Sequence, residues 1–197
     1  MMRLLTAGLL VVVLSGCAMF RSSSFHDALT PAEHITLARA YITSGETDAA
    51  QREYEAALAA DRDYVPAILG LGNLAFDQGR LDEAERQFTR ALAIDPLNAA
   101  ASNNLAMVYV TRHDRLDDAE RLARTALERG GPLRPYILDT LASVYVQQRR
   151  YADAERTLTE ADAEVPADNA ELRDRLGKLR QELAADQTAP TGGELTR

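Results

Sequence analysis

Residues 65–98 read VPAILGLGNLAFDQGRLDEAERQFTRALAIDPLN, a stretch of 34 residues. In its first half Ile68 and Leu71 share one arc of a helix with small residues. In its second half Ala84, Phe88 and Ala91 recur at helical spacing. The stretch therefore predicts two amphipathic helices that pack against each other as a hairpin. One hairpin cannot bury its apolar faces alone, so we expect it to stack on others.

The same pattern occurs in three further stretches, at residues 31–64, 99–134 and 135–168. Each second half carries alanine at two aligned positions: Ala50, Ala84, Ala119 and Ala154, then Ala57, Ala91, Ala126 and Ala161. A small side chain lets a neighbouring helix approach closely. The repetition predicts four stacked hairpins in an all-α chain.

The aligned residues identify a family resemblance. The seventh position of each unit is Leu37, Leu71, Leu105 or Leu141, the eighth is small, and Pro96, Pro132 and Pro166 close three units. This pattern resembles the tetratricopeptide repeat (TPR), W-x2-L-G-x2-Y…A-x3-F…P. The resemblance implies a right-handed α-solenoid with a concave groove that binds peptides.

Helix signals define both ends of the repeats. Thr30, Pro31 and Glu33 form a capping box that starts the first helix. After the repeats, residues 169–186 carry leucines at helical spacing and predict a capping helix. Residues 187–197, with Pro190 and two glycines, predict a disordered tail.

The N-terminus predicts export. Residues 1–16 have a basic start, an apolar run from Leu4 to Leu14, and small residues, as in a signal peptide. Leu14-Ser15-Gly16-Cys17 resembles the lipobox of bacterial lipoproteins. That resemblance implies cleavage before Cys17 and attachment of a diacylglycerol, with acyl chains such as palmitate, to its thiol. The other interpretation is an ordinary secretory signal with an incidental cysteine.

Lipidation would make Cys17 the membrane anchor. Residues 17–30 would then be the lipidated cysteine and a short Ser-rich tether. In the lipoprotein family of two-membrane bacteria, Asp after the cysteine favours the inner membrane, so Ala18 implies the outer membrane. We expect a protein that is lipid-anchored there and faces the periplasm.

Composition argues against several classes of function. The 197 residues include 22 Lys and Arg against 30 Asp and Glu, for a net charge of -8, without a basic block. This disfavours a nucleic-acid partner. One cysteine and three scattered histidines argue against a metal centre. We interpret Gly70-Leu71-Gly72 as close helix packing, and we expect no cofactor and no catalytic site.

The first helix of each unit also has a side that faces away from its own hairpin. In the TPR family this side lines the groove. We predict that it carries Arg39, Asn73, Phe76, Asp77, Asn103, Met107, Tyr136, Asp139, Ser143 and Gln147. At the twelfth position, Phe76 and its equivalents have two interpretations, an anchor for a bound segment or packing between units.

One TPR subclass binds a C-terminal carboxylate through two Asn and several cations. Asn73 and Asn104 fall at the Asn positions, but Leu69, Tyr136 and Thr140 replace the cations. We therefore expect no recognition of a carboxylate end.

Three functions compete at this stage. The first is a lipid-anchored adaptor that assists assembly of an envelope machine, as short TPR lipoproteins do for type IV and related pili. The second is an adaptor for cell-wall hydrolases or outer-membrane protein assembly. The third, an enzyme, is disfavoured because no convergent reactive groups stand out. The sequence leaves the oligomeric state open.

Overall fold

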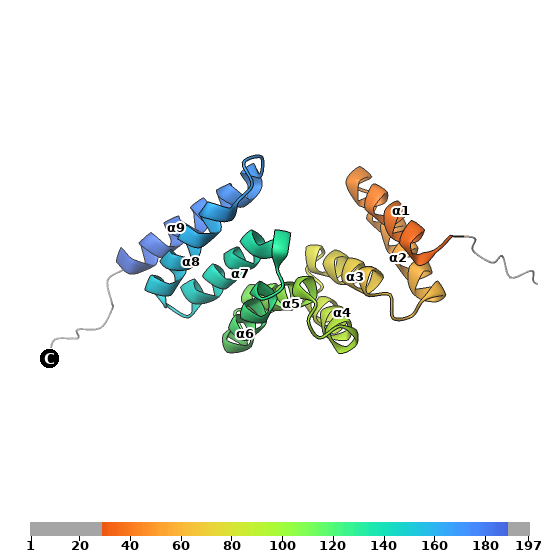
Figure 1. Ribbon diagram of the computed structural model, residues 1–197, viewed down its shortest axis with the longest axis horizontal. Coiled ribbons are helices and arrows are strands. Elements are labelled where there is room, and N and C mark those ends of the chain that lie inside the picture. The colour runs from red at the N-terminus through yellow and green to blue at the C-terminus, as the bar shows by residue number, and fades with distance from the viewer. Residues whose placement is uncertain (1–28, 189–197) are drawn as a thin grey trace, which may run out of the picture.

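The computed structural model describes residues 29–188, and within this range the chain is helical without a strand. Figure 1 shows the order of the helices. Their bounds are α1 Pro31–Ser44, α2 Thr47–Ala60, α3 Val65–Asp77, α4 Leu81–Ile94, α5 Ala99–Arg112, α6 Leu116–Leu127, the short 3₁₀ helix η1 Gly131–Leu133, α7 Arg134–Gln147, α8 Tyr151–Glu164 and α9 Ala170–Thr188. The all-α prediction is confirmed for these residues.

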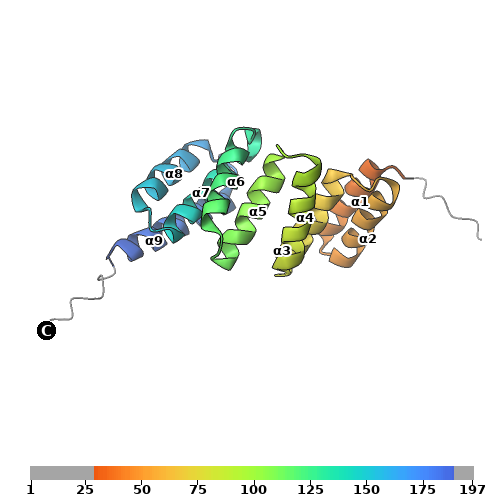
Figure 2. The same cartoon turned by 90° about the horizontal axis from the view of Figure 1, so that it is seen from below.

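The helices pair in chain order and the pairs form an arc (Figure 1). The most extensive contacts join α1 to α2, α3 to α4, α5 to α6 and α7 to α8. Successive first helices also touch, from α1 through α3, α5 and α7 to α9. Seen from below, neighbouring helices lie side by side along the molecule (Figure 2). The helices α3 and α5 lie on the inner side of the arc and α4 and α6 on the outer side.

Small residues set the distance between the helices. The aligned alanines of the second helices are fully buried or nearly so. A Cβ atom on Gly70 would lie 2.3 Å from the ring of Tyr54, and one on Gly72 would lie 2.5 Å from the ring of Phe88. The interpretation of these glycines as close packing positions is confirmed.

We predict that Gly72→Ala lowers the free energy of unfolding by about 1–2 kcal/mol, because overpacking outweighs the gain in helix propensity. Gly177 in α9 is the matched control, since a Cβ there would meet nothing within 4 Å. Gly177→Ala should raise stability by about 0.5–1 kcal/mol. Urea denaturation of both variants measures the difference, and equal shifts would contradict the packing argument.

Arginine side chains that combine an ion pair with a cation–π contact join the later units. The guanidinium of Arg115 lies 4.2 Å from the centre of the Tyr109 ring and binds Glu85 of α4 at 3.1 Å. Arg150 repeats the arrangement one unit later, over Tyr145 and against Glu120 of α6. Burial and the charge of Glu85 raise the pKa of Tyr109 to about 12. These arginine contacts link α4 to the start of α6 and α6 to the start of α8. The sequence predicted stacking of the units but not these contacts.

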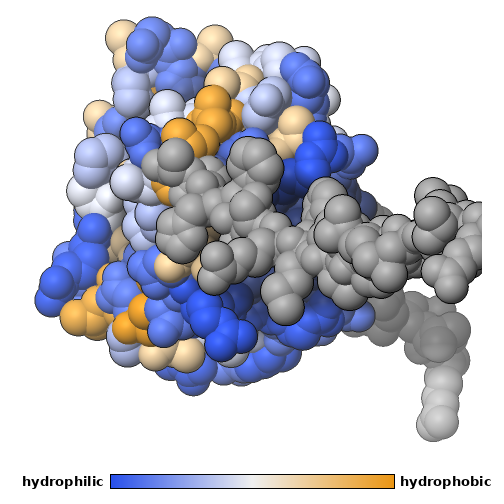
Figure 3. All heavy atoms as spheres, turned by 90° about the vertical axis from the view of Figure 1, so that its right-hand side faces the viewer, coloured by the Kyte–Doolittle hydropathy of each residue, from blue (hydrophilic) through white to orange (hydrophobic). Residues whose placement is uncertain are grey.

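The two ends of the solenoid differ. At the start, the Thr30 side chain accepts a hydrogen bond from the Glu33 amide, and the Glu33 carboxylate accepts one from the Thr30 amide, which confirms the capping box. Leu37 and Ile42 on α1 are 38% and 42% exposed. Figure 3 views this N-terminal end, with hydrophobic atoms among hydrophilic ones.

At the other end, α9 packs on α7 and α8. Four leucines of α9, Leu172, Leu176, Leu179 and Leu183, join the large apolar core. The helix ends at Thr188, two residues beyond the predicted end of the capping helix. Most of the predicted tail, residues 189–197, lies outside the described residues. So do the predicted signal peptide, Cys17 and nearly all of the tether.

Candidate protein-interaction groove

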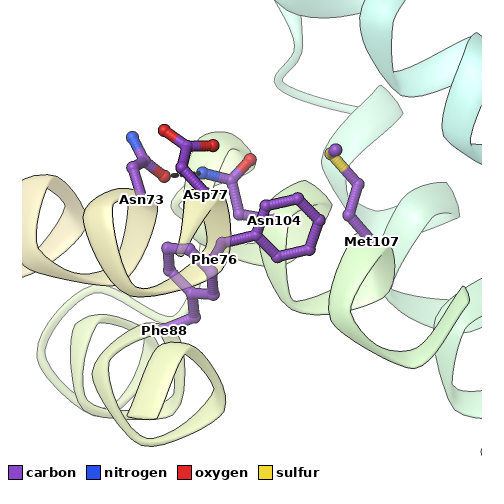
Figure 4. Close-up of a pocket in the computed structure, with 6 residues that line it drawn as sticks. All are labelled: Asn73, Phe76, Asp77, Phe88, Asn104 and Met107. Atoms are coloured by element: carbon purple, nitrogen blue, oxygen red, sulfur yellow. Dashed lines mark hydrogen bonds between the residues drawn. The ribbon is translucent and has the colours of Figure 1, made fainter. Parts of the chain in front are cut away.

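A hollow opens on the inner side of the arc between α3 and α5. It has a volume of about 290 Å³ and is lined by Asn73, Phe76, Asp77, Phe88, Asn104 and Met107. Figure 4 shows Asn73 and Asp77 projecting from α3 and Met107 from α5, all on the side away from α4. Phe88 reaches up from α4 below them. The hollow therefore has an apolar base and a polar rim.

Two amides cross this hollow. The Nδ2 of Asn104 donates a hydrogen bond to the Oδ1 of Asn73 at 2.8 Å. This bond engages the amide oxygen of Asn73, and the amide nitrogen of Asn73 lies on the side away from Asn104 (Figure 4). Because an exposed amide can pair with a peptide backbone, Asn73 is suited to hold an extended segment.

A second hollow adjoins the first and lies between α1 and α3. Its volume is about 500 Å³, and Asn73 belongs to both hollows. The lining residues are Ile35, Arg39, Tyr54, Val65, Pro66, Leu69, Gly70, Asn73 and Asn98. The two hollows meet at Asn73, and we call the surface formed by their lining residues the N-terminal groove.

Comparison with known families agrees with this geometry. A tetratricopeptide repeat model matches residues 69–135 and 103–169, and a second tetratricopeptide repeat model matches residues 41–88. The matched residues cover more than half of the chain. The chain belongs to the tetratricopeptide repeat family. This TPR fold is typically a protein-interaction scaffold.

Solved structures share the TPR fold. TTC0263, a thermophilic TPR protein of Thermus thermophilus, matches with a TM-score of 0.62 and 22% identity over 77% of this chain and 81% of that chain. PilF of Pseudomonas aeruginosa matches with a TM-score of 0.62 and 22% identity over 81% of this chain and 74% of that chain. MamA matches with a TM-score of 0.57 and 20% identity over 77% of this chain and 94% of that chain. Comparison with curated protein sequences finds no match.

Two residues predicted for the TPR groove are buried instead. Asn103 is 7% exposed and Asp139 is 3% exposed. Both occupy the fifth position of their units, and in these two units the side chain at that position is buried. Asp139 is ion-paired with Arg175 of α9. Burial raises the pKa of Asp139, and the Arg175 charge opposes this rise. Neither side chain is therefore exposed to a partner in the groove.

The last TPR unit uses its groove side for contacts within the chain. The Tyr136 hydroxyl accepts a hydrogen bond from Nδ2 of Asn169 at 2.6 Å. Gln147 donates through Nε2 to the carbonyl of Val110 at 3.0 Å, and Ser143 donates to the carbonyl of Asp139 at 3.0 Å. The capping helix and the residue before it thus contact Tyr136 and Asp139, whereas Gln147 contacts α5.

The remaining predicted residues gather in the N-terminal groove. Arg39, Asn73 and Asp77 are exposed, while Phe76 and Met107 are half-buried. Phe76 combines both interpretations of the twelfth position, because it lines the hollow and packs against the large core. The prediction did not include Phe88, Tyr54 and Asn104 as groove residues. The sequence did contain a signal for them. Tyr54 and Phe88 are equivalent positions of the second helices, and Asn104 lies on the first helix of its unit.

Other kinds of site find no support in the described residues. None of the described helices has the length and apolar character needed to span a membrane. Over residues 29–188 no three His, Cys, Asp or Glu side chains gather as metal ligands would.

Proposed function

We propose that this TPR protein is a lipid-anchored adaptor that binds a segment of a partner protein in its N-terminal groove. The partner would be a component of an envelope machine such as a type IV or related pilus. The observation that carries the proposal is the open hollow between α3 and α5, where the exposed amide of Asn73 and the half-buried amide of Asn104 lie beside an apolar base. Membrane attachment through Cys17 at the outer membrane, on its periplasmic side, is part of the proposal.

Three features support this function together. The TPR fold is a scaffold for protein contacts, and the groove offers both apolar and backbone-pairing groups. The lipobox-like sequence ending at Cys17 supports an anchor close to the folded units. PilF of Pseudomonas aeruginosa shares the fold, and this likeness supports a pilus-related partner.

Crosslinking in living cells tests which machine is served. A photoreactive residue at position 107 lies at the groove wall, and the matched control has the same residue at position 52 on the outer helix α2. Under the proposal, a pilus-assembly component crosslinks from position 107 alone. Capture of a cell-wall hydrolase or an outer-membrane assembly factor from that position would replace the first function by the second.

We predict that Cys17→Ala abolishes stable membrane attachment, because a lipidated cysteine supplies the anchor in the proposal. The variant should remain an unprocessed precursor and should lose metabolic labelling with an alkyne fatty acid. Gel mobility and labelling of the full chain in cells measure both effects. Continued acylation of the variant would exclude Cys17 as the attachment point.

We predict that Asn73→Ala weakens binding of the partner about tenfold while the melting temperature stays nearly unchanged. Loss of an amide that pairs with a bound backbone costs about 1–3 kcal/mol of binding. Asn73 is exposed, and its side-chain contact within the described residues is to Asn104. Gln51→Ala, which removes an amide from α2, is the control. Equal affinities of the two variants, measured by calorimetry, would move the binding site away from the groove.

A further inference from the structure

Charges of opposite sign stand in the two hollows of the N-terminal groove. Arg39 of α1 lines the hollow over the N-terminal half of α3, and Asp77 lines the hollow over its C-terminal half. Burial raises the pKa of Tyr54, which lines the same hollow as Arg39, and the Arg39 charge opposes that rise. Asp77 projects beside Asn73 at the rim (Figure 4).

Both charges are available to a ligand. Within residues 29–188, Arg39 and Asp77 have no side-chain ion pair or hydrogen bond, and both are exposed. The charged side chains elsewhere on the inner helices behave differently. Asp139 is paired with Arg175, and Arg112 is paired with Asp82 and Glu85. An unpaired cation and an unpaired anion thus flank the shared amide of Asn73.

Each charge stands beside an apolar surface. Ile35 and Leu69 lie in the hollow with Arg39, and Phe76 and Met107 lie in the hollow with Asp77. Each hollow can therefore accept an apolar side chain next to a charged one. The two hollows share Asn73, so one segment of chain that pairs with this amide can enter both.

We propose that the occupant of the groove is an extended peptide segment of mixed charge. Its acidic side chain pairs with Arg39, its basic side chain pairs with Asp77, and apolar side chains between them enter the two hollows. Packed helices lie about 8–10 Å apart and an extended chain spans about 3.3 Å per residue, so the two charges of the segment stand about two to three residues apart. This inference rests on the proposed function and names the kind of segment recognised.

Selection from a random peptide library displayed on phage tests the composition. The target is the full chain purified in detergent, and the comparison targets are Arg39→Glu and Asp77→Arg. We expect the unaltered chain to enrich peptides with an acid and a base at the stated spacing. The Arg39→Glu target should lose the acidic residue from its enriched peptides, and Asp77→Arg should lose the basic one.

Affinities of one enriched synthetic peptide complete the test. Charge reversal at either position should weaken its binding about tenfold, and each variant should retain the melting temperature of the unaltered chain. Arg52→Glu on α2 removes an exposed cation outside the groove and should leave the affinity unchanged. Asn73→Ala reports separately on use of the groove.

The outcomes separate the two proposals. Peptides that require Asn73 but bind equally to the charge-reversed variants would overturn the mixed-charge inference and leave groove binding intact. Peptides that lose affinity equally with Arg52→Glu would overturn it as a non-specific charge effect. Failure to enrich any peptide that depends on Asn73 would overturn both the inference and the groove as the adaptor site.

Discussion

Phe88→Ala is expected to lower the free energy of unfolding by about 3–5 kcal/mol, the largest effect of any single change considered for this chain. Phe88 is 1% exposed, and its ring packs so closely on Gly72 that a Cβ atom there would overlap it. Removing the ring opens a cavity between α3 and α4 and also removes the base of the groove hollow. Urea denaturation at neutral pH measures the loss.

Phe88→Leu is the control for this prediction, because it keeps most of the apolar volume. It should retain most of the stability that alanine loses. Phe76 is half-buried, so Phe76→Ala should lower the free energy of unfolding by less than Phe88→Ala does. A smaller loss for Phe88→Ala than for Phe76→Ala would contradict the ordering that burial predicts.

Arg175→Ala is expected to lower the free energy of unfolding by about 2–3 kcal/mol at neutral pH. The change leaves the Asp139 carboxylate buried without its cation, and removal of one partner of a buried pair is strongly destabilising. Because the Arg175 side chain is itself partly exposed, solvent screens part of the interaction, and we expect a smaller loss of stability than for a fully buried pair. The loss should appear at α9, which the ion pair fastens to α7.

The pH dependence has a defined sign. Burial already raises the pKa of Asp139 above its ordinary value, and removal of Arg175 should raise it further. A carboxyl with a raised folded pKa destabilises the fold when ionised, so acidification through that pKa should reduce the loss. The deficit of Arg175→Ala against the unaltered chain should shrink between pH 7 and pH 5. In the double variant with Asp139→Leu the deficit should be smaller and independent of pH.

The helix pairs could be predicted because their causes lie within each unit. Alanine and glycine at fixed spacing, as at Gly72 and Ala91, allow close approach whatever lies beyond the hairpin. The capping box at Thr30 is likewise local, because its partners are three residues apart. The fold class follows from such residues and from the period that repeats them.

The groove was predicted less well because its shape depends on how units stack. Helical spacing assigns Asn103 and Asp139 to the side that faces away from their own hairpins. It does not say that these side chains become buried in the stacked units. At the fourth position, the polar side chains of His34 and Ser102 are buried as well. His34 reaches Glu53 at 2.7 Å, a partner that spacing along one helix does not reveal.

The one-sided character of α9 determines where this array can be lengthened. Its leucines all face the preceding helices, while the residues around them, such as Arg173, Lys178 and Glu182, are exposed. A unit appended after Thr188 would meet a charged surface and find no apolar face to cover. An additional 34-residue unit should therefore be accepted only before α9, between Glu164 and Asn169, where the leucines can close the new last unit as they close the present one.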